Sequence, residues 1–183
     1  MVGFCAAGMD TVTSTKGTLD NISNYRQYSP LFASSGQPSK ADLQTVRDAN
    51  YKRVIYLAFS NDETAIEAED RVVKELGMRY VQIPVDFDKP TLTDFQTFLA
   101  LMRTEPDTKT LLHCQVNLRA STFSLLYRVI ELKVPMAEAK QALDSVWLPN
   151  ETWFRFLKST LDHYGLSYAC DECDWGELEF LDD

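Results

Sequence analysis

Short apolar runs alternate along the chain with longer segments in which apolar residues recur every three or four positions. The runs at residues 31–35, 53–58, 78–85 and 109–113 have the length and composition of buried strands. The segments between them have the period of helices that turn one apolar side toward a core. This alternation is typical of a sheet with helices on its faces, so the pattern predicts an α/β fold.

Two of the helical segments begin with residues that can cap a helix. Ser39 stands three residues before Asp42, and Thr91 three residues before Asp94. In such a pair the hydroxyl accepts an early helical N–H group, while the carboxylate accepts the N–H group of the capping residue. We expect helices that follow Ser39 and Thr91 and end near residues 49 and 102.

A third segment is expected to form an amphipathic helix that starts at Asp62 or Thr64 and ends at Gly77, because glycine commonly terminates helices. Beyond the last apolar run, the pattern predicts three consecutive helices at residues 120–132, 135–146 and 150–164.

The length and charge of the chain suit a single domain with an acidic end. Of its 183 residues, 45% are hydrophobic, which is enough to bury one core. The net charge is −9, and residues 170–183 hold seven acids and no base. We expect a flexible segment at 1–19, a folded domain at 20–165 and an acidic tail at 166–183. The chain has neither a basic stripe for nucleic acid nor an apolar run of the roughly 18 residues that span a membrane.

The first nine residues, MVGFCAAGM, are apolar but lack the positively charged start of a signal peptide. We expect a cytoplasmic protein, with export to the periplasm as the alternative if this stretch is the remnant of a signal segment. Nothing in the sequence indicates an oligomeric state.

Cys170 and Cys173 form a C-x-x-C pair within the acidic tail. This spacing occurs in redox pairs and in one half of a zinc site, but no second C-x-x-C or spaced His pair completes a zinc set. We expect two free thiols, with a disulfide as the alternative.

The stretch LLHCQVNLRAST, residues 111–122, combines a cysteine, an arginine and hydroxyl groups where a strand gives way to a helix. Such a loop collects unpaired backbone N–H groups and the positive end of the helix dipole, so it attracts anions. This field, together with Arg119, favours the nucleophilic thiolate form of Cys114. Arg119 can also hold two oxygens of a phosphate and neutralise charge in a transition state.

The other residues of this loop are expected to support the same chemistry. Ser121 is placed to stabilise the thiolate as a leaving group, and His113 to orient the loop through hydrogen bonds. Asn117 tolerates the left-handed dihedrals for which such loops often use glycine. The alternative is an inert buried cysteine beside an unrelated arginine. The residues expected to surround the oxyanion are His113, Gln115, Val116, Asn117, Leu118, Ala120 and Ser121.

The segment HCQVNLRAS resembles the H-C-x5-R-[ST] loop of protein tyrosine and dual-specificity phosphatases, with one residue fewer between Cys114 and Arg119. The shorter spacing is similar to the C-x-x-G-x-R loop of the beta-lactamase-hydrolase-like branch of these cysteine phosphatases. That branch also has an S-G-Q-P turn, here residues 35–38, followed by a helix and a V-I-x-L strand. The resemblance implies a phosphatase-like α/β fold with a central, mostly parallel sheet flanked by helices and a three-helix C-terminal half. It also implies a cysteinyl-phosphate intermediate and neither a metal nor another cofactor.

Related phosphatases place an aspartate general acid on a loop after the preceding strand. The segment IPVDFDKPT offers Asp86 and Asp88 there, 28 and 26 residues before Cys114. The resemblance favours Asp86 as the acid and Asp88 as its alternative, unless both are solvated loop carboxylates. Phe87, between them, either covers the site or packs.

Two departures from the phosphatase pattern keep other functions open. Only four residues separate Cys114 from Arg119, and Asn117 stands at the glycine position. Rhodaneses also use six-residue loops that begin at cysteine. The expected function is still hydrolysis of phosphomonoesters. The substrate is expected to be a phosphorylated protein, including one with phosphotyrosine, or a small phosphorylated metabolite. The alternatives are sulfur transfer through a persulfide on Cys114 and a module that binds oxyanions or phosphoproteins without catalysis.

Overall fold

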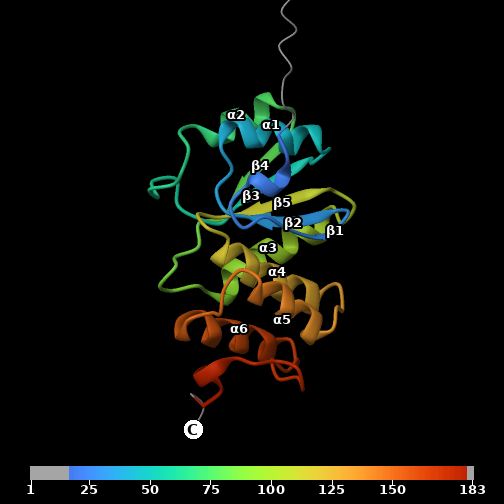
Figure 1. The fold of residues 1–183 in the computed structure, drawn as a ribbon, viewed down its shortest axis with the longest axis vertical. Coiled ribbons are helices and arrows are strands. Elements are labelled where there is room, and N and C mark those ends of the chain that lie inside the picture. Colours follow the sequence, from blue (N-terminus) through green and yellow to red (C-terminus); the bar gives the residue numbers. More distant parts are fainter. Residues whose placement is uncertain (1–16, 181–183) are drawn as a thin grey trace, which may run out of the picture.

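The computed structural model describes residues 17–180, which form a five-stranded sheet between helical layers (Figure 1). The strand order is β1-β2-β5-β3-β4; β1 is antiparallel to β2, and the other neighbours are parallel. The predicted α/β fold with a mostly parallel sheet is confirmed. The strands are β1 (Arg26–Ser29), β2 (Phe32–Ser35), β3 (Arg53–Tyr56), β4 (Arg79–Gln82) and β5 (Thr110–His113).

The helices cover both faces of the sheet, with α1 and α2 on one face and α3, α4, α5 and α6 on the other (Figure 1). Three of them, α4, α5 and α6, follow the last strand, as expected for the C-terminal half. The helices are α1 (Lys40–Asp48), α2 (Glu69–Glu75), α3 (Leu92–Thr104), α4 (Leu118–Ile130), α5 (Met136–Asp144) and α6 (Glu151–His163), with short 3-10 helices η1 (Leu19–Asn21) and η2 (Gly176–Phe180).

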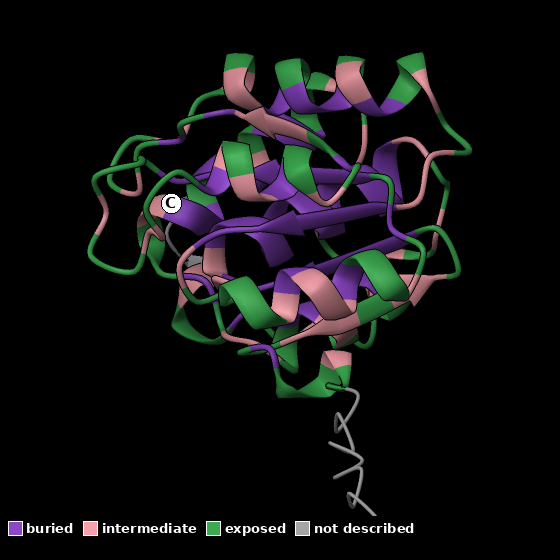
Figure 2. Ribbon diagram, turned by 90° about the horizontal axis from the view of Figure 1, so that it is seen from above, coloured by how far each residue is buried: buried purple, intermediate pink, exposed green. Residues whose placement is uncertain are grey.

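Each face of the sheet has its own hydrophobic core. The larger core packs α3, α4 and α6 against the sheet and includes Phe98, Phe123 and Trp153. The smaller core lies under α1 and α2 and includes Leu43 and Val73. The strands between the two cores are largely buried, whereas the outer sides of the helices are exposed (Figure 2). The central strand β5 is therefore held on both faces, which gives the loop after it a rigid base.

Both predicted capping boxes are present. The Ser39 hydroxyl accepts the N–H group of Asp42, and the Asp42 carboxylate accepts the N–H group of Ser39. Thr91 and Asp94 exchange the same two hydrogen bonds at the start of α3. These local signals placed the starts of α1 and α3 correctly.

The predicted start of the second helix is wrong, because α2 begins at Glu69 rather than at Asp62 or Thr64. Asp62 lies in turns, where its N–H group donates to the Phe59 carbonyl and its own carbonyl accepts from Ala65. The residue before α2, Ala68, has a left-handed backbone with φ of 56°, which no helix can include. The segment before Glu69 therefore stays outside the helix.

The structure differs from the sequence analysis in two further elements. Strand β1 was not predicted, because as an edge strand it buries too little of its length to show an apolar pattern in Arg26–Ser29. Helix α4 begins at Leu118, two residues before the predicted start. The earlier start brings Arg119 into the first turn of the helix.

The acidic C-terminal segment packs against α6. Trp175 is fully buried, with its ring 5.4 Å from that of Phe154. Cys170 and Cys173 form a disulfide, so the expectation of two free thiols is wrong. The N–H group of Cys173 donates to the Cys170 carbonyl, and this turn brings the two Cα atoms to 5.1 Å, within the usual range for disulfides.

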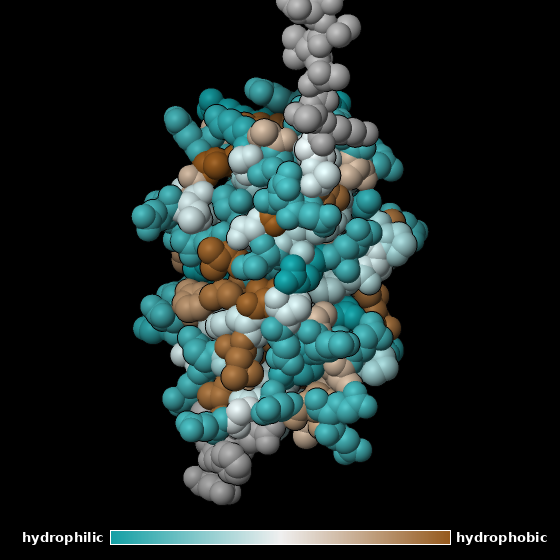
Figure 3. Space-filling view, in the orientation of Figure 1, coloured by the Kyte–Doolittle hydropathy of each residue, from teal (hydrophilic) through white to brown (hydrophobic). Residues whose placement is uncertain are grey.

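The surface is mainly hydrophilic, with separate apolar patches on the face shown in Figure 3. Within residues 17–180, no helix has the length and apolar character needed to cross a membrane. Most of the segment expected to be flexible, residues 1–16, lies outside the described residues.

Candidate active site

The candidate site lies at the edge of the sheet where the parallel strands β5, β3 and β4 end. Arg119, in the first turn of α4, contacts the loop that follows each of these strands. Its Nε donates to the Val85 carbonyl at 3.0 Å, and its Nη1 donates to Gln115 Oε1 at 3.1 Å. Its Nη2 lies 3.6 Å from Asp62 Oδ2. Arg119 is 5% exposed, and contacts with three separate loops hold its guanidinium in one place.

Two carbonyl groups of the loop after β5 are bound from outside the loop. The Gln115 carbonyl accepts the N–H group of Gln37 at 2.8 Å, and the Val116 carbonyl accepts the Asn24 side chain at 3.0 Å. Because a trans peptide is planar, the N–H group of Val116 points opposite to the Gln115 carbonyl. These external bonds thus direct peptide N–H dipoles toward the inner side of the loop.

Asn117 leaves the start of α4 open. Its backbone is left-handed, with φ of 74°, as expected for an asparagine in the glycine position. Its Nδ2 donates to the Asn24 carbonyl at 2.6 Å, and its side chain makes no capping bond to the helix. The first N–H groups of a helix have no acceptor within the helix. Those of α4 therefore remain available to an anion at this site.

Cys114 stands at the base of the loop and is 1% exposed. Among residues 17–180, Cys114 is the only cysteine outside a disulfide. Its N–H group donates to the Ser35 carbonyl at 3.3 Å, which ties the cysteine to the S-G-Q-P turn. Cys114 is thus a buried sulfur between the end of β5 and the open start of α4.

Contrary to expectation, His113 does not orient the loop through hydrogen bonds. Its ring stacks on Tyr56, with centroids 4.8 Å apart, and its Nε2 lies 3.2 Å from Glu69 Oε1. The same carboxylate oxygen accepts the Gln37 side chain at 3.0 Å. Burial, followed by the charges of Asp62 and Glu69, raises the pKa of the Tyr56 hydroxyl. His113 is thus fully buried between Tyr56 and Glu69.

Ser121 also differs from its expected role. Its hydroxyl donates to the Leu118 carbonyl at 3.1 Å rather than to Cys114, and the residue is 1% exposed. Ala120 is fully buried next to it. The structure therefore brings Gln115, Val116, Asn117 and Leu118 around the open side of the loop, while the side chains of His113 and Ser121 are engaged elsewhere.

The loop with the two candidate acids adjoins Arg119. Phe87 lies over the guanidinium at 5.2 Å, and its carbonyl accepts Trp153 Nε1 at 2.9 Å. Asp86 and Asp88 are both exposed, and Asp86 Oδ1 accepts the N–H group of Asp88 at 2.9 Å. Phe87 is thus a packing residue that holds the loop against the site, with Asp86 next to the carbonyl that Arg119 binds.

Several residues of the site had not been predicted. Asp62 reaches Arg119 only because β3 is the neighbour of β5 in the sheet, and no local signal announces this order. Asn24 and Glu69 reach the loop from equally distant segments. The S-G-Q-P turn was a usable signal for Gln37. Among residues 17–180, no three His, Cys, Asp or Glu side chains converge so as to hold a metal ion.

Gly36→Ala is expected to lower kcat/KM by about tenfold or more, because small displacements of catalytic groups have large effects on rate. A Cβ at Gly36 would lie 2.9 Å from the Gln115 carbonyl oxygen and 3.0 Å from Ser23 Cβ, so the loop would have to shift. Steady-state kinetics and thermal unfolding of the variant check this. Gly17→Ala is the matched control, because its nearest neighbour is the rotatable Thr45 hydroxyl. Wild-type kcat/KM in Gly36→Ala would contradict the close packing.

A family model described as "DSP-PTPase phosphatase fused to NAD+ Kinase" matches residues 6–150 of the chain. Among solved structures, the chain is similar to a candidate phosphatase (DUF442) from Shewanella putrefaciens CN-32, with 30% sequence identity and a TM-score of 0.74. The match covers 80% of this chain and 96% of that one. No curated protein matches the chain.

Two more distant structures share the fold. The core catalytic domain of the PP-IP phosphatase SIW14 from S. cerevisiae is 12% identical, with a TM-score of 0.64, and the match covers 78% of this chain and 88% of that one. TpbA from P. aeruginosa, solved in complex with pTyr, is 15% identical, with a TM-score of 0.62, and the match covers 77% and 87%. At these identities the likeness shows the fold alone. Together with the family model, the matches confirm the resemblance to cysteine-dependent phosphatases.

Proposed function

We propose that the chain hydrolyses phosphate monoesters with Cys114 as the nucleophile, since it belongs to the family of DSP-PTPase phosphatases fused to NAD+ kinase. The observation that carries this proposal is the arrangement around Arg119. One guanidinium, fixed by three loops, lies in the first turn of the helix whose open start follows Cys114. A cationic fork and unpaired N–H groups beside a cysteine suit a tetrahedral oxyanion.

The proposed reaction has two steps. The Cys114 thiolate attacks phosphorus, so that an S–P bond forms while the bond to the leaving oxygen breaks. Asp86 gives its proton to that oxygen, and Arg119 and the loop N–H groups hold the three equatorial oxygens. Water then attacks phosphorus, the S–P bond breaks, and the thiolate and inorganic phosphate are released. Asp86 accepts the proton of this water and is ready for the next cycle.

The proposed substrate is a phosphate monoester on a protein or on a small metabolite. TpbA was solved with pTyr and SIW14 is a PP-IP phosphatase, so proteins of this fold take different phosphorylated molecules. A panel of phosphotyrosine peptide, phosphoserine peptide, small alkyl phosphate and activated aryl phosphate separates them. Thiosulfate with cyanide belongs in the same panel, because a short loop also suits a persulfide.

Asp86→Asn is expected to lower turnover of tyrosyl and alkyl phosphates by about 100-fold, the lower range for general acid catalysis. An activated aryl phosphate should lose much less, because its leaving group departs without a proton. Asp88→Asn is the matched control, since Asp88 is also exposed on the same loop and its replacement should have little effect. Steady-state kcat/KM on both substrate types gives the comparison.

Three results would change the assignment. An equal loss on both substrate types would mean that Asp86 only shapes the loop through its bond to the Asp88 N–H group. Leaving-group dependence in Asp88→Asn alone would exchange the two roles. If neither variant showed it and thiosulfate were the better substrate, sulfur transfer would replace hydrolysis as the function.

A further inference from the structure

A second pocket with cationic walls lies between the edge strand β1 and helix α5. Its volume is about 430 Å³, within the range of small-molecule sites. It contains two arginines and one carboxylate, in a chain whose net charge is −9. The residues around it are Arg26, Gln27, Tyr28, Arg128, Glu138, Gln141, Ala142 and Ser145.

Arg128 is buried yet incompletely bound. Its side chain is 5% exposed, and its guanidinium lies over the Tyr28 ring at 5.0 Å. Its Nη2 donates to Glu138 Oε1 at 2.7 Å, whereas its Nη1 is buried and has no hydrogen-bond partner within residues 17–180. Buried donors are normally satisfied, so an orphaned guanidinium nitrogen needs an explanation. An anion with two oxygens in reach of Nη1 and Nη2 would provide one.

Arg26 adds a second positive charge, which no carboxylate within residues 17–180 balances. Its Nε and Nη2 donate to the hydroxyl and carbonyl of Ser145 at 2.7 and 2.6 Å, and its Nη1 donates to the Tyr25 carbonyl. All three acceptors are neutral, and three bonds leave two of its five N–H donors free. Burial raises the pKa of Tyr28, while its hydrogen bonds to Ser34 and Ser124, and then the charges of Arg128 and Arg26, lower it.

Glu138 is the group that a ligand would replace. Its side chain is 62% exposed, so it can turn into solvent at little cost, and it offers Arg128 a single oxygen. A phosphoryl group carries more negative charge than a carboxylate at neutral pH and has three strong acceptor oxygens. It can therefore bind both nitrogens of the Arg128 fork and still reach a free donor of Arg26.

We propose that this pocket binds the phosphoryl group of a small phosphorylated molecule, with Arg128 and Arg26 as its ligands and Glu138 as the displaced counter-ion. The site is separate from the Cys114 loop. Arg119 and Arg128 belong to opposite ends of α4, roughly 14 Å apart along the helix axis. The pocket exceeds the size of one phosphate, which leaves room for the organic part of the ligand.

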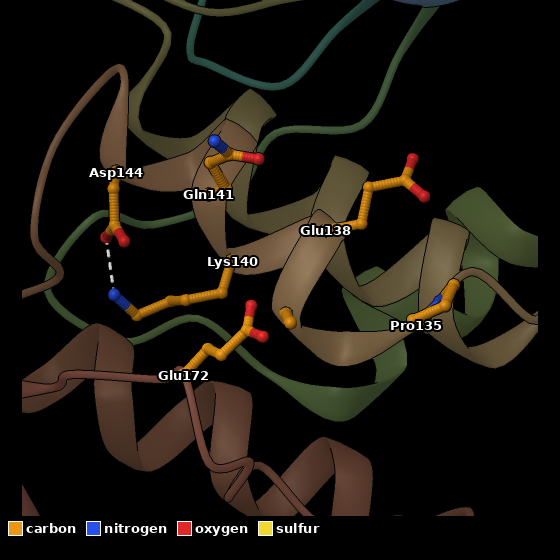
Figure 4. Close-up of a pocket in the computed structure, with 7 residues that line it drawn as sticks. Pro135, Glu138, Lys140, Gln141, Asp144 and Glu172 are labelled. Carbon is orange, nitrogen blue, oxygen red and sulfur yellow. Dashed lines mark hydrogen bonds and ion pairs between the residues drawn. The ribbon is translucent and has the colours of Figure 1, made fainter.

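The pocket on the other side of α5 shows the contrast. It has a volume of about 470 Å³, and its buried cation, Lys140, is bound to Asp144 at 2.5 Å. Figure 4 shows this pair, with the Glu172 carboxylate close by and the side chains of Glu138 and Gln141 turned away from it. Lys140 also lies over the Trp175 ring at 4.5 Å. Its charge is already balanced, whereas the pocket beside β1 offers an anion the unbound Nη1 of Arg128.

The test is a titration of inorganic phosphate, and in a second arm O-phosphoserine, into ¹⁵N-labelled Arg119→Ala at constant ionic strength. The Arg119 change weakens binding at the Cys114 loop, and the side-chain Nε–H signals of Arg128 and Arg26 report the second pocket. We expect both signals to shift and saturate together. Tighter binding of O-phosphoserine than of inorganic phosphate would identify an organic phosphate as the ligand; the reverse order would overturn that part of the proposal.

Two substitutions should move the affinity in opposite directions. Glu138→Gln should lower Kd severalfold, because it removes the competing charge, and Arg26→Gln should raise Kd about tenfold, the cost of one charge-assisted hydrogen bond. Glu151→Gln is the matched control, since its side chain is 59% exposed and paired with Arg155 on α6. Thermal unfolding verifies that each variant is folded. Absence of saturation at Arg128, or equal effects of Glu138→Gln and Glu151→Gln, would overturn the proposal.

Discussion

Cys114→Ser is expected to abolish turnover of every phosphate ester in the panel, with a loss of at least about four powers of ten. A serine hydroxyl at neutral pH is a far weaker nucleophile than a thiolate. The fold and oxyanion binding should persist, because the carbonyl bonds of the loop involve Gln37 and Asn24 and not the sulfur. Steady-state kinetics and the thermal shift caused by vanadate or phosphate measure the two quantities separately.

A control for this experiment uses the other two cysteines. The double variant Cys170→Ser/Cys173→Ser removes the disulfide of the C-terminal segment and should leave kcat at the wild-type level. Wild-type turnover in Cys114→Ser would refute Cys114 as the nucleophile. Loss of oxyanion binding together with turnover would indicate instead that the sulfur is needed to shape the loop.

Arg119→Lys should lower kcat/KM by about two powers of ten or more, the usual effect of losing a contact made in the transition state. Lysine keeps the charge but loses the planar fork. It also loses the three-point attachment, because a single ammonium cannot bind Val85, Gln115 and Asp62 in the directions that the guanidinium uses. Steady-state kinetics on the activated aryl phosphate measure the effect without a contribution from the general acid.

Arg103→Lys serves as the matched control, since Arg103 forms an exposed ion pair with Glu131 on another part of the molecule. It should leave kcat/KM unchanged. If Arg119→Lys were as active as the wild type, the guanidinium would have a structural role, holding the acid loop through the Val85 carbonyl without contact to the substrate.

The extent to which the fold was predictable follows from how local each signal is. The capping boxes at Ser39 and Thr91 and the glycine stop at Gly77 act within one turn of helix, so the sequence placed them correctly. Strand β1 escaped prediction because an edge strand needs no apolar face. The start of α2 was misplaced because Ala68 adopts a left-handed backbone that its own side chain does not favour.

The candidate site divides in the same manner. Cys114, Arg119 and Asn117 belong to one continuous loop, so their spacing already indicated an anion-binding turn. The stacking of His113 on Tyr56 and its contact with Glu69 could not be predicted from the histidine itself. The hydrogen bond from the Ser121 hydroxyl to the Leu118 carbonyl could not be predicted either. Those contacts depend on which helix covers which face of the sheet.

The sequence by itself determined the α/β class, the strand-to-helix loop with its cysteine and arginine, and the left-handed asparagine, because each rests on periodicity, spacing or the intrinsic preferences of neighbouring residues. Tertiary structure alone decided what surrounds Arg119 and Arg128. The order β5-β3-β4 brings Asp62 and Val85 to Arg119, and the packing of α5 beside β1 brings Glu138 and Arg26 to Arg128. Such long-range contacts arise when burial of two hydrophobic cores fixes the strand order, and this global balance leaves no trace in a local stretch of sequence.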